Sequence, residues 1–254
     1  MIRACGVSDA GPVRRTNEDA FVSAPDVQLF AVSDGMGGQK AGEVASQLTI
    51  DAMTAFIRRS AEDIDFTWPF GIDQTLSING NRLRTAINLA NRRVFRTAET
   101  SDDYSGMGAT VVAVLVNGTG VSIGHVGDSR LYALANGVLE QLTVDDSLAA
   151  VLTHEAGLGT EAIAHHPMKN VLTNVLGARE SVQVHMTERT LAPGEVLLLC
   201  SDGLHGTVDD AGLRDILMSV PDVDEAAQRL VTTAIERGSR DNVTALVVRL
   251  EGSA

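Results

Sequence analysis

The chain has 254 residues, of which 44% are hydrophobic and 21% are charged. This composition is typical of a folded protein with a sizeable core and excludes an intrinsically disordered chain. The formal net charge of −13 makes nucleic acids and anionic membrane surfaces poor partners, because phosphate groups attract basic faces.

The N-terminal half predicts a strand followed by a pair of helices. Residues 29–32 form a short apolar run that ends in a glycine-rich turn. Apolar residues recur at helical spacing over 41–59 and over 81–98, which predicts two amphipathic helices. Residues 60–80 show neither pattern, so we expect an irregular surface segment between the helices.

The C-terminal half predicts a series of antiparallel strands. Hairpin signals at Asn117-Gly118 and Asn136-Gly137 separate short apolar runs. Residues 145–178 are less regular and predict a helical flap, and a further amphipathic helix is predicted at 222–237. The predicted strands are 111–116, 121–126, 131–134, 138–142, 182–189, 196–200 and 243–250.

This order of elements predicts an α+β fold. No β-α-β unit repeats along the chain, so a parallel sheet is not expected. The strands suffice for a central β-sandwich of two antiparallel sheets flanked by helices, an α/β/β/α arrangement. Because the chain has no linker, repeat or low-complexity tract, we expect a single domain over 1–254 with a flap at about 145–178.

The chain has no sequence feature of a secreted or membrane protein. No stretch approaches the about 20 apolar residues of a membrane span. The first residues lack an apolar segment followed by a cleavage site. Cys5 and Cys200 lie in strand-like runs and are expected to be reduced thiols. We therefore expect a cytoplasmic protein, and a monomer.

Acidic residues lie at several predicted strand ends, each beside a glycine or a tight turn. Any one of them has an ordinary interpretation as a turn residue. In a sandwich, however, strand ends on one rim converge, and carboxylates held close together raise each other's pKa unless cations neutralise them. The acidic residues at these ends are Glu18, Asp19, Asp34, Asp128, Asp202 and Asp241.

Such a cluster predicts a site for hard divalent cations. Oxygen ligands without His or Cys pairs favour Mg²⁺ or Mn²⁺ over zinc. A glycine such as Gly35 allows its carbonyl to turn toward a metal, although a simple strand-to-helix turn is the alternative. Two such ions suit phosphate-ester hydrolysis, because they activate a bridging water and neutralise phosphoryl oxygens. Arg14 or Arg15 would supply a planar cation for the phosphate.

The chain also contains an ordered set of short motifs, at 13–19, 33–38, 41–46, 106–110, 127–130, 200–204 and 241–244. In order and approximate spacing, this set resembles the metal-dependent protein phosphatases (PPM, or protein phosphatase 2C-like, serine/threonine phosphatases). The resemblance is greatest to the compact bacterial branch and spans about residues 3–250. The fold that it implies, a β-sandwich flanked by helices, agrees with the pattern of elements.

The resemblance implies a metal-binding role for several of the acidic residues. Asp34 would bridge two tightly bound Mn²⁺ or Mg²⁺ ions, and the carbonyl of Gly35 would complete the site of one of them. Asp202 and Asp241 would bind the other ion. Asp128, together with Asp202, would hold the third, weaker ion of this family.

The resemblance also implies roles around the metals. Arg14 matches the phosphate-binding arginine, and Glu18 and Asp19 would orient metal-bound waters, Glu18 from nearer the ions. Met36 stands where eukaryotic relatives carry a histidine thought to protonate the leaving alkoxide, so a metal-bound water or an unidentified group must do this. In the flap, Asn170 stands where some bacterial relatives use a serine near the third metal.

The histidines have mostly structural interpretations. His125 lies among apolar strand residues and is expected to be a hydrogen-bonded core histidine. His165 and His166 lie in the flap, where contact with substrate is the less favoured alternative. His205 follows Asp202 closely enough to be a candidate proton donor, but local packing or hydrogen bonding is favoured.

The resemblance implies hydrolysis of phosphoserine and phosphothreonine in proteins by a water that two metal ions activate. The partners that it implies are phosphorylated proteins, among them a bacterial serine/threonine kinase or its substrates. One alternative is the same fold used as a binding module, which loss of a metal-bridging aspartate would mark. Another is a different metal-dependent hydrolase, either a nuclease, which the charge disfavours, or a small-molecule phosphatase.

Overall fold

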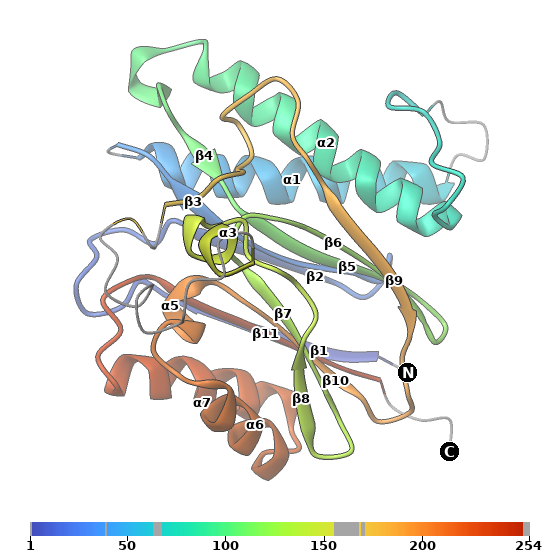
Figure 1. Ribbon diagram of the computed structural model, residues 1–254, viewed down its shortest axis with the longest axis vertical. Helices are drawn as coiled ribbons and strands as arrows, with labels where there is room; N and C mark the ends of the chain where they lie inside the picture. Colours follow the sequence, from blue (N-terminus) through green and yellow to red (C-terminus); the bar gives the residue numbers. More distant parts are fainter. Residues whose placement is uncertain (1, 39, 63–67, 155–167, 169–170, 251–254) are drawn as a thin grey trace.

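The strands of the protein form two antiparallel sheets that pack face to face (Figure 1). The computed structural model describes residues 2–38, 40–62, 68–154, 168 and 171–250. One sheet has the strand order β1 (Ile2–Asp9), β11 (Val243–Leu250), β10 (Val196–Cys200), β7 (Arg130–Ala135) and β8 (Val138–Gln141). The other has the order β2 (Asp19–Ala24), β3 (Leu29–Met36), β5 (Val111–Asn117), β6 (Gly120–Val126) and β9 (His185–Thr190), and β4 (Gly108–Ala109) pairs with β3.

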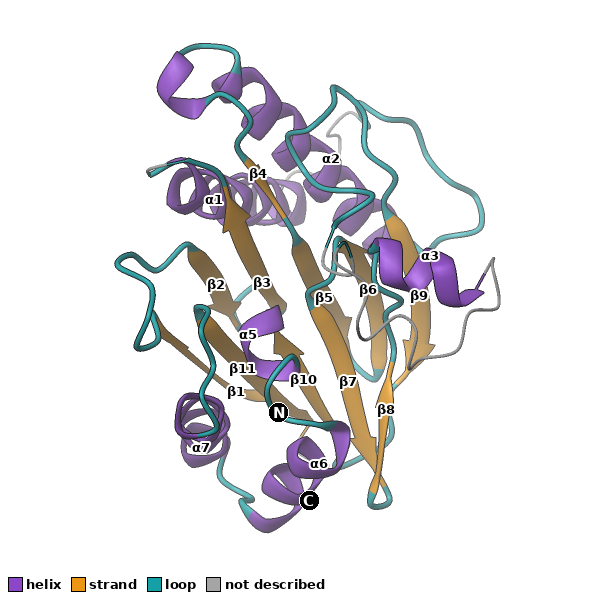
Figure 2. Ribbon diagram, turned by 60° about the vertical axis from the view of Figure 1, so that its left-hand side comes forward, coloured by secondary structure: helices purple, strands orange, loops and turns teal. Residues whose placement is uncertain are grey.

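Helices cover the outer face of each sheet (Figure 2). The sheet that contains β3 is covered by α1 (Ala41–Glu62) and α2 (Ile78–Ala98). The sheet that contains β11 is covered by α5 (Asp202–His205), α6 (Asp210–Ser219) and α7 (Val223–Glu236). Two short elements, η1 (Asp102–Tyr104) and α3 (Leu148–His154), complete the helices of the described residues. No helix among these residues is both long and apolar enough to cross a membrane.

Alternation along the strands builds the core in layers. On β3, Phe30 and Val32 point into the core between the sheets, whereas Leu29 and Ala31 point toward α1 and α2. Because side chains of a strand alternate between its faces, a strand buried on both sides needs apolar residues throughout. These four side chains are fully buried. The layered order helices, sheet, sheet, helices confirms the predicted fold class.

Several predicted boundaries need correction. The second helix begins at Ile78 rather than at 81, because the Ser77 hydroxyl accepts a hydrogen bond from the Gly80 N–H and caps it. The first helix continues to Glu62 rather than ending at 59. Strand β9 starts at His185 rather than at 182.

The C-terminal helices and the flap also differ from the prediction. Helices α5 and α6 were not predicted, and α6 buries only Leu213 and Leu217, which is a weak apolar pattern. The predicted helical flap at 145–178 contains helix only over Leu148–His154 among its described residues. The described residues from 171 to 178 form turns and isolated bridges instead.

Candidate metal centre

The sandwich brings acidic residues from distant parts of the chain to one rim. Asp34 lies near the end of β3, Asp128 follows β6, Asp202 opens α5 directly after β10, and Asp241 precedes β11. All of them line one cavity of about 410 Å³. The other residues that line it are Arg14, Glu18, Gly35, Met36, Gly37, Thr110, Leu172 and Val175.

Close backbone approach at Gly35 fixes one wall of this cavity. A Cβ atom at residue 35 would overlap the carbonyl oxygen of Gly42, in the first turn of α1. Glycine is therefore required for α1 to lie against the end of β3. The approach places Asp34 and the start of α1 on the same side of the cavity.

Burial and mutual repulsion raise the pKa values of these carboxyl groups. Burial is the main cause at Asp34, where the charges of Asp19 and Asp202 add to it and hold the pKa well above its usual range. Burial and the charge of Asp202 raise the pKa of Asp128 to about 7. Burial and the charge of Asp241 raise the pKa of Asp202 to about 6. The ionised form of these carboxyls is therefore disfavoured unless a cation lies among them.

Backbone and hydroxyl hydrogen bonds hold Asp34 in place. The Thr110 hydroxyl accepts a hydrogen bond from the Asp34 N–H at 3.1 Å, and the Asp34 carbonyl accepts one from the Thr110 N–H at 2.8 Å. The Ser33 hydroxyl donates to the Thr110 carbonyl at 2.7 Å. These bonds tie the end of β3 to the start of β5, so the Asp34 carboxylate projects from a rigid strand end.

Asp19 joins the two sheets directly beneath the rim. Its Oδ2 atom accepts hydrogen bonds from the hydroxyls of Ser201 and Thr244, each at 2.6 Å. Asp19 belongs to β2 of one sheet, whereas Thr244 belongs to β11 of the other. Burial raises the pKa of Asp19 to about 7 despite these bonds. Asp19 is not among the residues that line the cavity.

Arg14 and Glu18 lie at the cavity on the loop between β1 and β2. The Arg14 guanidinium donates a hydrogen bond of 2.6 Å to Asp241 Oδ2, and 49% of its side chain is exposed. Burial raises the pKa of the Glu18 carboxyl, and its N–H donates to the side chain of Asn242 at 2.8 Å. Asn242 also donates to backbone carbonyls of this loop at Ala10 and Thr16, which fixes the loop against β11.

The donor chemistry of the rim fits divalent cations. Asp202 Oδ1 is buried and has no hydrogen-bond partner among the described residues, which leaves a lone pair in the cavity for a cation. Within the same part of the chain, no group of three His, Cys, Asp or Glu side chains is arranged to hold a metal ion. The Arg14 guanidinium and the Asn242 N–H occupy both oxygens of Asp241 in this arrangement. Each of these oxygens keeps a second lone pair, so Asp241 can still approach a cation while it holds Arg14.

The structure also describes Met36, His205 and His125 from the sequence analysis. Met36 lines the cavity, but a thioether carries no proton to donate. The His205 ring hydrogen-bonds the Asp128 carbonyl oxygen at 3.0 Å, and burial lowers its pKa to about 4, so the local-bonding interpretation is confirmed. His125 is 8% exposed and bonds the Val144 carbonyl oxygen, as expected of a core histidine. Asn170, His165 and His166 lie outside the described residues.

Sequence analysis assigned no role to several polar residues that organise the rim. Thr110, Ser201 and Thr244 orient Asp34 or Asp19, and Asn242 holds the loop of Arg14. Each lies within one of the short motifs, and Ser201 and Asn242 also adjoin an acidic residue, which was the available signal. Leu172 and Val175 from the flap also line the cavity without having been singled out.

The raised pKa values predict how stability depends on pH. In metal-free buffer, the melting temperature should fall by several degrees as the pH rises from about 5 to 8. The folded state keeps protons on Asp202, Asp128 and Asp19 up to pKa values of about 6 to 7, whereas the unfolded chain loses them near 3.8. Thermal melts in chelator check this. Saturating Mn²⁺ should flatten the slope, and a melting temperature that rises with pH in chelator would contradict it.

The chain is similar to a family of known proteins. The family model described as Protein phosphatase 2C matches residues 14–245. The serine/threonine protein phosphatase PstP of Mycobacterium tuberculosis is 36% identical over 247 residues, which cover 97% of this chain and 45% of PstP. The chain thus spans less than half the length of that relative. The serine/threonine phosphatase stp of Listeria monocytogenes is 35% identical over 249 residues, covering 95% of this chain and 93% of stp.

A solved structure extends the likeness to the whole fold. The catalytic domain of PstP, crystallised in complex with 2 manganese ions, superimposes with a TM-score of 0.82 at 35% identity and covers 99% of each chain. The family model and the solved structure both cover the residues that form the sandwich and the acidic rim. This chain belongs to the protein phosphatase 2C family.

Proposed function

We propose that this chain hydrolyses phosphoserine and phosphothreonine in proteins and depends on Mn²⁺ or Mg²⁺. The observation that carries the proposal is that Asp34, Asp128, Asp202 and Asp241 line one cavity together with Arg14. Carboxylates suit hard cations, and a guanidinium suits a phosphate group. The family membership and the manganese bound to the PstP catalytic domain support it.

Asp34 and the carbonyl of Gly35 would hold one ion, and Asp202 and Asp241 would hold a second that Asp34 shares. Asp128 with Asp202 would hold a third, weaker one. The chemistry that such ions supply when bound is activation of a water for attack on phosphorus and neutralisation of the phosphoryl oxygens. Since the pKa values of these carboxyls are raised, loading the site must release protons into solution.

Arg14 would bind the phosphoryl group at the mouth of the cavity. Its guanidinium is half exposed and is held beside the carboxylates by Asp241, so an incoming phosphate meets a cation that is already oriented. Met36 carries no proton, and His205 is neutral and bonded to the Asp128 carbonyl oxygen. Neither side chain can therefore protonate the leaving alkoxide, and a water at the ions or an unidentified group would do so.

Replacing Arg14 with alanine should raise KM for a phosphoester about 10- to 150-fold and lower kcat less. A bidentate arginine contact contributes about 1.5–3 kcal/mol, and it acts on bound substrate and transition state alike. Steady-state kinetics with a chromogenic phosphoester measure both constants. Arg15→Ala is the matched control and should leave KM unchanged. A KM that rises only in the Arg15 variant would assign the phosphate contact to Arg15.

We also propose that the chain is a monomeric, single catalytic domain that acts in the cytoplasm against a bacterial serine/threonine kinase or its substrates. Cys5 and Cys200 are free thiols, as a reducing compartment favours. Phosphoproteomics of a deletion strain against its parent should show phosphoserine and phosphothreonine sites that rise in the deletion. Phosphopeptides that bind the pure protein without losing phosphate would instead identify a non-catalytic binding module.

A further inference from the structure

A second cavity opens beside the metal centre, and the known motifs assign it no role. Its volume is about 710 Å³, which falls in the range of cavities that bind a drug-sized molecule. Leu172 and Val175 line both this cavity and the acidic one, so the two are neighbours along this segment of the flap. Its other lining residues are Asp146, Thr173, Asn174, Ala178, Arg179, Ser181, Val182 and Gln183.

Asp146 makes one wall of this cavity rigid. Its Oδ2 atom accepts hydrogen bonds from the Asn174 side chain at 2.8 Å and from the Gly127 N–H at 3.0 Å. Its Oδ1 atom lies 2.9 Å from Nε2 of His185. The carboxylate is thus fully used by groups of the protein, and its side chain is only 13% exposed. The same bonds tie the flap to the turn that carries Asp128.

Asn91 of α2 fixes the loop that carries Arg179. The Asn91 amide donates to the carbonyl oxygens of Arg179 and Glu180 at 3.1 and 3.0 Å. Its oxygen accepts from the Gly177 N–H at 2.9 Å. Asn91 is buried, so this loop is anchored to the helix layer rather than to solvent. Figure 1 shows residues 171–184, which lead into β9, passing across α2.

Arg179 is the cation that this cavity offers to a ligand. Its side chain is exposed, and it forms no ion pair with any carboxylate of the described residues. The acidic residue among the lining, Asp146, is already satisfied by its own donors. Ser181 and Gln183 add a hydroxyl and an amide group that suit a peptide backbone. An anionic, hydrogen-bonding ligand fits this combination.

We propose that this cavity binds the polypeptide segment that flanks the phosphorylated residue, with Arg179 selecting an acidic side chain there. The inference rests on the proposed phosphatase function. A phosphate group held at the acidic rim leaves its chain at the mouth of that cavity, and each extended residue advances the chain by about 3.3–3.6 Å. A neighbouring cavity that shares two lining residues with the rim is reached within a few residues. Arg179 therefore sets sequence preference without touching the phosphate.

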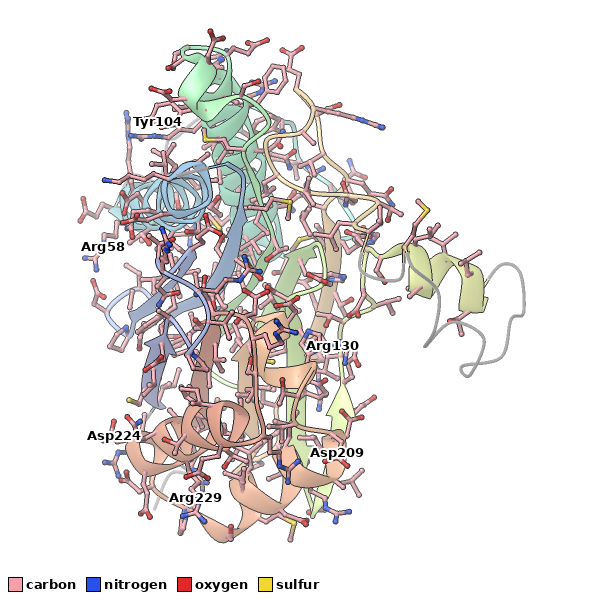
Figure 3. The ribbon with its side chains drawn as sticks, turned by 90° about the vertical axis from the view of Figure 1, so that its left-hand side faces the viewer. Arg58, Tyr104, Arg130, Asp209, Asp224 and Arg229 are labelled. Atoms are coloured by element: carbon pink, nitrogen blue, oxygen red, sulfur yellow. The ribbon has the colours of Figure 1, made fainter. Side chains whose placement is uncertain are left out.

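The test compares Arg179→Glu with Arg229→Glu, which makes the same change of charge on the outer face of α7 (Figure 3). Substrates are phosphothreonine peptides carrying Glu, phosphoserine, Ala or Lys at each nearby position, and a chromogenic phosphoester. Arg179→Glu should lower kcat/KM about fivefold to twentyfold for the peptide with an acidic residue in the preferred position, because repulsion replaces attraction. It should raise kcat/KM for the Lys peptide and leave the chromogenic ester and Arg229→Glu unchanged.

The peptide with a second phosphate separates two sources of negative charge. A larger effect of Arg179→Glu on that peptide than on the Glu peptide would assign the cavity to doubly phosphorylated segments, and an equal effect would assign it to acidic side chains. Ser181→Trp, which fills the cavity from an exposed position, should raise KM for every peptide and spare the chromogenic ester.

Several outcomes overturn the inference. If Arg179→Glu changed kcat/KM equally for the Glu and Lys peptides, Arg179 would not discriminate between charges on the substrate. Equal changes for peptide and chromogenic ester would place its effect in the acidic cavity instead. If the wild-type protein cleaves the chromogenic ester but no phosphopeptide, the proposed protein phosphatase function fails, and that result is distinct from a loss of selectivity.

Discussion

Asp34→Asn should lower kcat for a chromogenic phosphoester by about 10²- to 5 × 10³-fold, since losing one partner of a buried ionic interaction costs about 3–5 kcal/mol and each 1.36 kcal/mol is tenfold. The charges of Asp19, Asp202, Asp128 and Asp241 all add to the burial that raises the pKa of Asp34. An amide retains the shape of the carboxyl but cannot balance the charge of a cation. The rate should fall at every Mn²⁺ concentration.

The folded state should survive this substitution. Removing an acidic group from a crowded, partly buried cluster relieves repulsion, so metal-free Asp34→Asn should melt at or above the melting temperature of the metal-free wild-type protein. Asp224→Asn, at an exposed carboxylate on α7 (Figure 3), is the matched control and should change neither quantity. Near-normal turnover by Asp34→Asn would exclude Asp34 as a bridging ligand.

Removal of divalent ions should abolish nearly all phosphoester hydrolysis, and Mn²⁺ or Mg²⁺ should restore it. The same titration should raise the melting temperature by about 5–10 °C, since ligand at a hundredfold excess over its Kd adds about 2.7 kcal/mol and each kcal/mol is worth about 2–4 °C at this size. The physical cause is that cations relieve the repulsion that raises the pKa values of Asp34, Asp128 and Asp202.

Two readouts make this experiment decisive. Recovery of activity on adding Mn²⁺ shows that the chelator did not denature the protein. A melting temperature that stays constant across the titration would mean that no ion binds the folded rim. Full activity in chelator would reject metal dependence altogether.

Strand alternation and motif spacing predicted the sandwich and the location of the acidic rim. The apolar runs at 29–32, 111–116 and 243–250 became central strands, because a strand buried on both faces shows continuous hydrophobicity. Asp34, Asp202 and Asp241 could be placed on one rim because each adjoins such a run. Gly35 could be singled out because a glycine beside an acid marks a close approach.

The other features of the fold and the site depend on contacts between residues far apart in the sequence. Local sequence patterns do not predict such contacts. The ion pair of Arg14 with Asp241 joins residues 227 positions apart. Helix α6 buries only Leu213 and Leu217, so its packing against α7 rather than its own pattern stabilises it. The cavity at Arg179 depends on Asn91, from a helix whose pattern gives no sign of the loop that it holds.

The hydrogen bonds of Asp19 to Ser201 and Thr244 limit which substitutions this protein can accept. One carboxylate both supports the rim and fastens the two halves of the sandwich through Ser201 and Thr244. A substitution at Asp19 therefore loosens the architecture whenever it alters the chemistry, so the two effects cannot be tuned separately there. A new substrate specificity can arise more readily at exposed positions around the rim, where a substitution leaves the contact between the two sheets intact.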